Sequence, residues 1–230
     1  FLLTLLAFLL PFENLIIPTM LITLADYRRI YSTIHSLLIA DSVDSHEASM
    51  LFSVYGAQIL KRHYGIAAQP VMGSAAYHLG LQAKVLAFGD YQAGQLKSSD
   101  SQHHWWIEAD GYLIDFMAPL FPVLVKRAGK EARIDPWMMQ KPMAKAKKIL
   151  TDVQAQGDFF ISENNVLASE KMSAMVTEKA HIQRGKLAID WFVKTPKKMP
   201  SPLNVKFEGA LQANKTKLIT YKSFLVSGAW

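Results

Sequence analysis

The 230-residue chain contains no cysteine. This absence excludes disulfides, zinc sites built from thiolates and catalysis by a thiol of this chain. Charged residues are also sparse at 19%, whereas half of the residues are hydrophobic. That balance is typical of a globular protein and unlike that of a disordered chain.

The sequence has no transmembrane span, which needs roughly 20 consecutive apolar residues. Its most apolar stretch, "FLLTLLAFLLPF" at residues 1–12, is shorter. That stretch resembles the core of a signal peptide but lacks a preceding basic segment and a following A-x-A cleavage site. We interpret residues 1–19 as an apolar leader or the end of a fragment, and we predict a cytoplasmic protein. If residues 1–19 are a truncated signal peptide, the protein is instead exported.

Positive charge is scarce in the first half of the chain. Residues 1–125 carry six Lys/Arg and ten Asp/Glu, a net charge of −4, whereas residues 126–230 carry nineteen and nine, a net charge of +10. A basic C-terminal part can bind an anionic partner, or it can form solvated helix faces. No aromatic residues interleave with these lysines, so there is no strong nucleic-acid signal. Phosphate loops and dinucleotide fingerprints are lacking too, and we predict no cofactor.

The apolar spacing predicts helices over residues 22–39 and 45–64, the second ended by Gly65. Short strands follow up to Gly89, then a surface loop from Asp90 to Gln102. Residues 137–156 and 165–185 have a mostly helical pattern. We therefore predict an α+β fold in which a long N-terminal helix packs on an antiparallel sheet. The core would span residues 20–125, and residues 126–230 would form a mostly helical, basic extension or subdomain.

The clearest hairpin is "HHWWIEADGYLIDF", residues 103–116, with Asp110-Gly111 as a favoured two-residue turn. This turn opposes Ile107 to Ile114. Side chains alternate between the two faces of a strand, so one face carries apolar residues and the other carries a polar set. The polar set consists of His104, Trp106, Glu108 and Asp115.

On that polar face His104 and Asp115 are diagonal neighbours, about 7–8 Å apart at Cα and within side-chain reach. His103 falls on the opposite face, so the register selects His104 as the partner of the carboxylate. A histidine held by an aspartate is the base and its orienter in a catalytic triad. Taken alone, the same two residues could also be an ordinary surface pair.

The segment "SMLFSVYGA", residues 49–57, resembles the nucleophile helix of papain and the cathepsins, which reads C-W-A-F-S, a few residues, then G-A. Phe52, Ser53, Gly56 and Ala57 fall in register, and Ser49 takes the position of the cysteine. "HWWIEADGYLID" is similar to the H-x-W-x-E segment of transglutaminase-like proteins, and "YLID" to the acid-bearing strand of arylamine acetyltransferases. The resemblance covers residues 44–120.

This resemblance implies acyl transfer, or hydrolysis of a peptide or amide-bearing substrate. Ser49 would occupy the nucleophile position, His104 would be the base and Asp115 its orienter. Trp106 would either line the substrate groove or pack against the helix. The papain-like pattern has a glutamine six residues before the nucleophile, where this chain has Val43.

Serine in place of cysteine changes the chemistry, because a hydroxyl ionises far less readily than a thiol and must lose its proton to a base during attack. Two interpretations follow: a serine-dependent hydrolase or acyltransferase, or a catalytically silent relative. A third interpretation, from another class, is a non-catalytic binding module. It would hold a peptide in the same cleft or an anionic partner on its basic C-terminal face.

Other polar residues carry weaker hypotheses. Ser45 lies one turn before Ser49 and is an alternative to it. His46 and Glu47 could bind a metal, but no third ligand stands at a recognisable spacing, so we predict no metal site. His63 and His78 are interpreted as structural or solvated.

Overall fold

The computed structural model describes residues 20–41, 45–80, 84–130, 133–194, 201–206 and 216–230. The predictions for residues 1–19 and for Val43 lie outside these ranges, as do the side chains of Ser45 and His46. The described residues form helices and antiparallel strands, so the predicted α+β class is confirmed. None of the helices in the described ranges is long and apolar enough to cross a membrane.

The two predicted N-terminal helices are α1 (Leu24–Asp41) and α2 (Ser45–Ile59). A π-helical turn, η1 (Leu60–Tyr64), extends α2 as far as Gly65. Gly65 has φ 69°, the left-handed conformation that the sequence predicts at this helix end. The helices pack against each other, and α2 also packs against the sheet.

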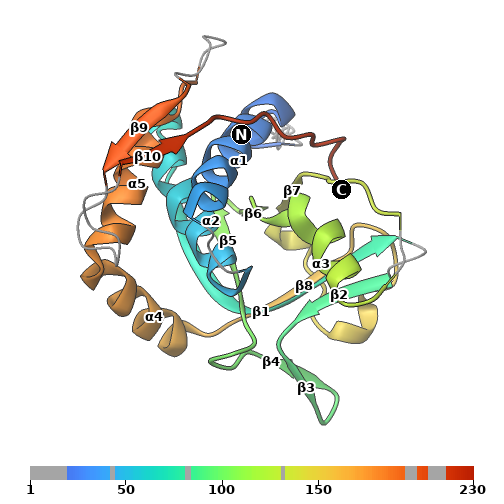
Figure 1. The fold of residues 1–230 in the computed structure, drawn as a ribbon. Coiled ribbons are helices and arrows are strands. Elements are labelled where there is room, and N and C mark those ends of the chain that lie inside the picture. The colour runs from blue at the N-terminus through green and yellow to red at the C-terminus, as the bar shows by residue number, and fades with distance from the viewer. Residues whose placement is uncertain (1–19, 42–44, 81–83, 131–132, 195–200, 207–215) are drawn as a thin grey trace, which may run out of the picture.

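A long strand, β1 (Ala68–Gly80), organises the sheet. Gly73 pairs with His104 on one edge and Glu163 on the other, and Ala75 likewise pairs with Phe88 and Ile161. The strands β2 (Lys84–Phe88) and β5 (His104–Ala109) therefore follow one another along one edge of β1, and β8 (Phe159–Glu163) lies along the other. From β5 the sheet continues through β6 (Tyr112–Asp115) to β7 (Met139–Pro142), and it curls into a half-barrel (Figure 1).

Between β2 and β5 the chain leaves the sheet and returns to it. The predicted loop of residues 90–102 is wrong in part, because it contains a hairpin of β3 (Asp90–Gln92) and β4 (Gln95–Lys97). This hairpin projects at the bottom of Figure 1. The Ser74 hydroxyl of β1 donates a hydrogen bond to the Leu96 carbonyl at 2.9 Å, which ties the hairpin to the sheet.

The β5–β6 hairpin has the predicted turn and register. Asp110 and Gly111 have φ angles of 45° and 77°, both positive as a type I′ turn requires. Ile107 pairs with Ile114 and Glu108 with Leu113. This register divides the hairpin between two apolar clusters. One cluster packs Ile107, Ile114 and Phe116 with α1 and α2. The other packs Trp106 and Leu113 with Tyr77, Phe121 and Phe159 on the opposite face of the sheet.

The C-terminal part is less helical than the sequence predicts. The predicted helix at residues 137–156 is wrong: this segment holds β7 and two short 3-10 turns, η3 (Met143–Lys145) and η4 (Leu150–Asp152). Met138 and Met139 are buried against the core, and Pro142 at the end of β7 disfavours a continuous helix. The division of the chain at residue 126 stays a prediction, although β7 and β8 complete the central sheet.

The predicted helix at residues 165–185 is confirmed as α4 (Asn165–Thr177) and α5 (Lys179–Trp191), which break at Glu178. The Asn164 side chain caps α4 by accepting a hydrogen bond from the Leu167 amide. The remaining elements of the described chain are η2 (Ala118–Leu120), α3 (Phe121–Arg127), β9 (Leu203–Lys206) and β10 (Thr216–Ile219). η2 joins the end of β6 at Asp115 to the start of α3 at Phe121.

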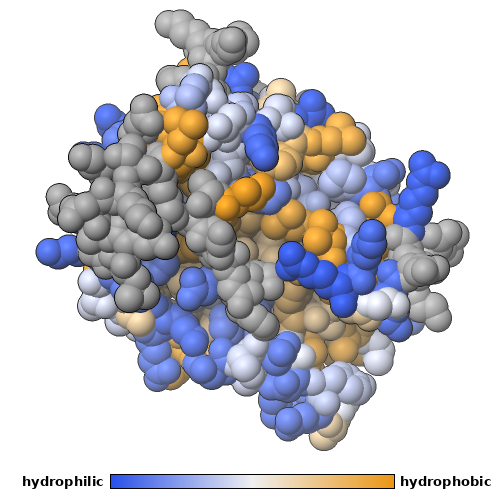
Figure 2. Space-filling view, in the orientation of Figure 1, coloured by the Kyte–Doolittle hydropathy of each residue, from blue (hydrophilic) through white to orange (hydrophobic). Residues whose placement is uncertain are grey.

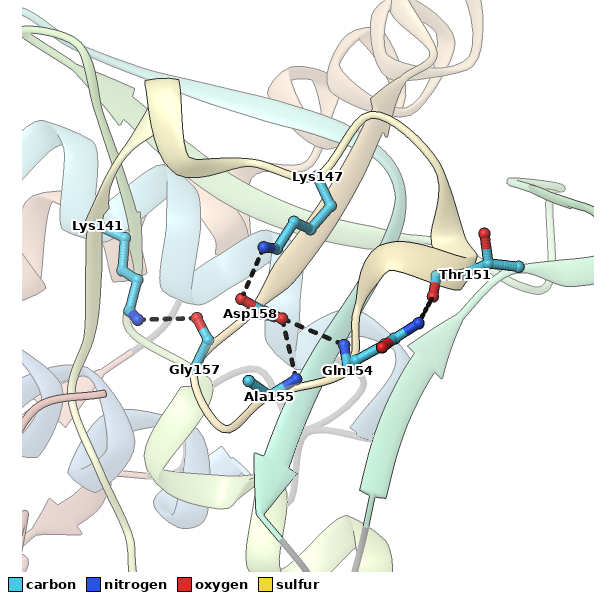
Figure 3. A network of polar contacts seen from close by, with 7 residues as sticks. All are labelled: Lys141, Lys147, Thr151, Gln154, Ala155, Gly157 and Asp158. Atoms are coloured by element: carbon cyan, nitrogen blue, oxygen red, sulfur yellow. Dashed lines mark hydrogen bonds and ion pairs between the residues drawn. The ribbon is translucent and has the colours of Figure 1, made fainter.

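Polar contacts fasten the segment between β7 and β8 (Figure 3). Asp158 accepts hydrogen bonds from the amides of Gln154 and Ala155 and pairs with Lys147 at 3.1 Å. Lys141 donates to the Gly157 carbonyl at 2.8 Å. The burial of Asp158 opposes ionisation, but these amide and lysine contacts prevail and lower the pKa of its carboxyl. The network holds this segment in place although it forms only short 3-10 turns and no α-helix.

The C-terminal segment crosses the outside of α1 (red in Figure 1). Arg28 donates to the Val226 carbonyl at 2.8 Å, and the amides of Phe224 and Lys222 donate to the hydroxyls of Ser32 and Ser36. The chain then reaches β7, where Met138 donates to the Gly228 carbonyl at 2.7 Å. The two ends of the described chain are thereby joined in one unit.

Candidate functional site

The sequence-predicted contact between His104 and Asp115 is present. Nε2 of His104 lies 2.7 Å from Oδ2 of Asp115, and the two side chains are 0% and 1% exposed. The other carboxylate oxygen of Asp115 accepts a hydrogen bond from the Met117 amide at 2.9 Å. The contact is confirmed, whereas the catalytic role of the two residues stays a prediction.

The backbone explains why His104 and not His103 is the partner. His104 is the first residue of β5 and pairs with Gly73 of β1, so its side chain is fixed on one face of the sheet. His103 lies just outside the strand, where its Nδ1 contacts the Ser99 carbonyl at 3.1 Å. Partial burial lowers the pKa of His103. The sheet therefore selects the histidine that alternation along the strand predicts.

Aromatic rings enclose the His104 imidazole. Phe88 stacks on it with centroids 4.1 Å apart, and the rings of Tyr77 and Phe121 have centroids at 5.8 and 6.0 Å. These rings come from β2, β1 and α3. Sequence reasoning missed all three, because their approach to His104 depends on strand pairing and on the turn after β6. In the sequence these three residues stand out only as apolar residues in the segments before and after His104.

The second ring nitrogen of His104 is unpaired in the part of the chain that the structure describes. Nδ1 is buried and has no hydrogen-bond partner among the described residues. Since a carboxylate accepts the hydrogen bond at Nε2, we assign the proton to Nε2 and the lone pair to Nδ1. A buried polar atom without a partner is destabilising and calls for a functional or structural explanation.

Two buried tyrosines lie around the Asp115 end of the pair. Tyr27 of α1 donates a hydrogen bond to the backbone carbonyl of Asp115. The Tyr77 hydroxyl is buried without a hydrogen-bond partner among the described residues. Burial, followed by the charge of Asp115, raises the pKa of both phenols well above its usual range. Both tyrosines therefore remain neutral and add no second negative charge beside Asp115.

Ser49 lies in the first turns of α2 and is 3% exposed. Further along the helix, a Cβ on Gly56 would meet Phe116 and Ile107, so this part of α2 lies directly on the hairpin. The C-terminal end of α2 leads into β1, whose first residue, Ala68, pairs with Ala109. Ser49 precedes Gly56 by about 10 Å along the helix axis. It therefore lies toward the other end of β5, the end that begins with His104.

Ser49 is nevertheless not in hydrogen-bond contact with the pair. Nε2 of His104 is occupied by Asp115, and Nδ1 has no partner in the described part of the chain. Ile107 and Phe116, which contact α2, point to the opposite face of the sheet from His104. The structure thus brings His104 and Asp115 together. It places Ser49 on the helix that packs against their hairpin, without a direct bond to either.

The weaker candidates have structural surroundings. Trp106 is fully buried on the His104 face and donates a hydrogen bond to Glu108 at 3.0 Å, so it packs in the core; its role in a substrate groove stays a prediction. His63 contacts the Ile189 carbonyl at 2.9 Å, and His78 accepts a bond from the Gly80 amide. Within the described ranges, no group of three His, Asp or Glu residues is placed to hold a metal.

These features define an α+β protein with a buried His–Asp pair beside a long packed helix. The chain belongs to the family named Protein of unknown function (DUF2026), which it matches over residues 23–230. It is also similar to the protein in "The crystal structure of genomics APC5867". The two are 34% identical over 92% of this chain and 98% of that one, with a TM-score of 0.81. No curated protein matches the chain.

Proposed function

We propose that the chain is a papain/transglutaminase-like protein whose site is arranged for acyl transfer or for hydrolysis of a peptide or amide bond. The observation that supports this most is the 2.7 Å contact between the buried side chains of His104 and Asp115 on adjacent strands. A carboxylate in this position fixes the imidazole tautomer and stabilises the imidazolium during proton transfer. α2 adds Ser49 at the nucleophile position of the resembling families.

In this proposal Nδ1 of His104 is the general base. Its lone pair is free because Asp115 holds the proton on Nε2, and Phe88 keeps the ring from turning. The Met117 amide holds Asp115 from its other oxygen. The groups that orient the base therefore come from three places. Asp115 belongs to the β5–β6 hairpin, Met117 to the turn after it, and Phe88 to β2.

The reaction begins when Oγ of Ser49 attacks the substrate carbonyl carbon and its proton passes to Nδ1 of His104. The tetrahedral intermediate collapses as the C–N bond breaks, and His104 returns the proton to the departing amine. This leaves an ester on Ser49, which water hydrolyses or an acceptor amine takes over. Because α2 packs on the face of the sheet opposite His104, this step requires Ser49 and His104 to approach each other in the complex, a larger change than the tightening of a loose hydrogen bond.

A non-catalytic binding module is the second candidate. It is favoured by the lack of a bond between Ser49 and His104 in the described structure and by the weak nucleophilicity of a serine hydroxyl. In this case the region between α2 and the β5–β6 hairpin holds a ligand, and Ser49 is a packing residue of the helix.

The substitution Ser49→Cys tests the catalytic arrangement. The chain has no other cysteine, so every reaction with iodoacetamide reports on this one thiol. A thiol near His104 and the N-terminal end of α2 has a lowered pKa, so it reacts faster at neutral pH than an ordinary thiol. We expect an enhancement of about tenfold or more over Ser53→Cys, whose thiol is placed at an equally buried position on the same helix.

Two further variants show whether fast alkylation comes from the catalytic arrangement or only from access of iodoacetamide to the thiol. Adding His104→Ala to Ser49→Cys should return the rate to that of an ordinary thiol. Ser53→Cys, one turn further along the same helix and equally buried, should react slowly. A Ser49→Cys thiol that reacts no faster than Ser53→Cys, in a protein that unfolds at the wild-type temperature, would exclude the catalytic arrangement and leave the binding module.

A further inference from the structure

A cavity of about 280 Å³ lies where α1, α2 and α3 meet. Its walls are mostly apolar and include Leu38, Phe52, Met117, Leu120 and Leu124. These side chains come from α1, α2 and α3, and from the turn η2 with Met117, which precedes it. No function assigned above uses this cavity.

The size of the cavity restricts its occupant. An apolar cavity of about 150 Å³ accommodates a benzene ring. The present cavity is therefore too large for a single phenyl-sized side chain. Its volume is near the lower limit, roughly 300 Å³, of pockets that bind small molecules. A flexible chain of several methylene groups matches this space better than one amino-acid side chain.

One side of the cavity carries a positive charge. Arg127, at the C-terminal end of α3, lines it and is exposed, and no ion pair of Arg127 occurs among the residues that the structure describes. The adjoining groove contains Lys126 and Lys130. An anionic group at the mouth of the cavity would therefore meet an unpaired guanidinium with further positive charge nearby.

The other polar group in the wall is His35. Its Nδ1 is buried without a hydrogen-bond partner in the described part of the chain, and its ring packs on Phe224 with centroids 4.2 Å apart. Burial, followed by the charge of Lys222, lowers the pKa of His35 to about 4. The imidazole is therefore neutral at physiological pH, and among the described residues that line the cavity Arg127 alone carries a charge.

The rim of the cavity is apolar and exposed. Ile39 and Val123 line it, and these residues are 47% and 44% exposed, values that are high for large aliphatic residues. Figure 2 shows hydrophobic surface directly beside strongly hydrophilic side chains in the region of α3. An apolar interior, an apolar rim and a cationic border together form a surface for an amphiphilic anion.

We propose that this cavity binds a medium-chain aliphatic carboxylate, with its hydrocarbon chain inside and its carboxylate on Arg127. The site does not depend on the proposed acyl-transfer function. It does share walls with that candidate site, because Ala48 lines the cavity and precedes Ser49, and because Met117 lines it and holds Asp115 through its amide. The positive charge of Arg127 favours a carboxylate over a neutral lipid. The volume of the cavity favours a hydrocarbon chain over the terminal side chain of a peptide.

Calorimetric titration of the full chain with octanoate tests the proposal. We expect saturable binding at one site, weakened about five- to tenfold by Arg127→Gln, since removing one partner of a partly exposed ion pair costs about 1 kcal/mol. Lys97→Gln, a matched neutralisation on the β3–β4 hairpin, should leave the affinity unchanged. Octanol should bind wild type as weakly as octanoate binds the Arg127→Gln variant.

Two additional variants test the position of the chain. Leu124→Phe narrows the cavity and should abolish octanoate binding, whereas Leu124→Ala enlarges it and should shift the preference toward decanoate. Ser49→Ala should bind octanoate like wild type, so the outcome is independent of the proposed catalysis. The proposal is overturned if folded wild-type protein does not bind octanoate, or if N-acetylphenylalanine binds more tightly, which would indicate a peptide terminus as the occupant.

Discussion

The phenyl ring of Phe88 stacks on the imidazole of His104, with ring planes 19° apart. Phe88 ends β2 and His104 begins β5, and both strands pair with the same edge of β1. The stack therefore bridges the point at which the chain leaves the sheet for the β3–β4 hairpin. It supports the imidazole on one face, while Asp115 holds it through Nε2.

Replacing Phe88 by alanine should disturb this support. We expect Phe88→Ala to lower the free energy of unfolding by about 1–3 kcal/mol, because the ring is only partly buried. In the Ser49→Cys background it should also slow alkylation, since the imidazole is no longer held in one orientation. Tyr91→Ala, on the exposed hairpin, is the control and should change neither quantity. Unchanged alkylation in Phe88→Ala would show that the stack does not position His104.

Asp115→Asn should reverse the tautomer of His104 while keeping the shape of the site. The asparagine oxygen can still accept from the Met117 amide, so its NH₂ group faces Nε2 of His104. Nε2 must then accept, and Nδ1 carries the proton and cannot act as a base. We expect alkylation of Ser49→Cys to fall by about tenfold or more. Stability should fall by only about 1–3 kcal/mol, measured by urea unfolding. A protein with unchanged thiol reactivity would contradict the assigned orienting role.

Gly56→Ala tests the contact between α2 and the hairpin. A Cβ at this position would lie 2.5 Å from the Phe116 ring and 3.0 Å from Ile107. Alanine gains about 1 kcal/mol of helix propensity, but overpacking a full core costs about 1–3 kcal/mol or more. We therefore expect a net loss of stability in thermal or urea unfolding. Gly185→Ala in α5 is the comparison, because its Cβ would lie 3.0 Å from the flexible Gln58 side chain and 3.2 Å from the Tyr55 ring, and so would meet no ring as closely as at Gly56. Equal effects at both positions would argue against close packing at Gly56.

His35 should make the stability of the protein pH-dependent. Burial, and then Lys222, lowers its pKa from 6.5 to about 4 in the folded state. Between these two values the unfolded chain binds a proton that the folded chain does not, so stability falls as the pH is lowered from 6.5 toward 4. The loss between pH 7 and pH 5 should be roughly 1–2 kcal/mol, allowing for solvent screening of the partly exposed ring.

The measurement is urea unfolding of wild type and His35→Phe at pH 7 and pH 5. The variant cannot take up this proton, so its stability should fall less between the two pH values. The loss of stability in wild type minus the loss in His35→Phe gives the contribution of His35, because the carboxylates that titrate in the same pH range contribute equally to both proteins. Identical losses in both proteins would show that His35 titrates normally in the fold.

The parts of the fold that follow from local rules were predictable. The Asp110-Gly111 turn fixes the register of its hairpin, and the register determines which histidine faces Asp115. Gly65 ends the α2–η1 helix because its left-handed conformation suits glycine. Each of these features depends on residues within about a dozen positions of one another. Over such short sequence distances, hydrophobic periodicity and turn residues are sufficient to predict the local structure.

The features that were missed depend on distant segments. Residues 139–142 join the sheet beside β6, because Met139 pairs with Asp115 across the ladder, and no local pattern indicates this partner. Phe88 meets His104 only because two strands share an edge of β1. The position of Ser49 relative to the His–Asp pair depends on how α2 lies on a curled sheet. A match in the spacing of short motifs gives the order of Ser49, His104 and Asp115 along the chain. It does not tell on which face of the sheet each side chain lies.

The shared edge of β1 also makes the β3–β4 hairpin replaceable. The chain departs after Phe88 and re-enters at His104, so the two anchor points are set by the ladder and not by the hairpin itself. A longer or shorter excursion could be accommodated there without altering the strand register. Such an exchange would leave the enclosure of the imidazole intact, because Phe88, Tyr77 and Phe121 come from β2, β1 and α3.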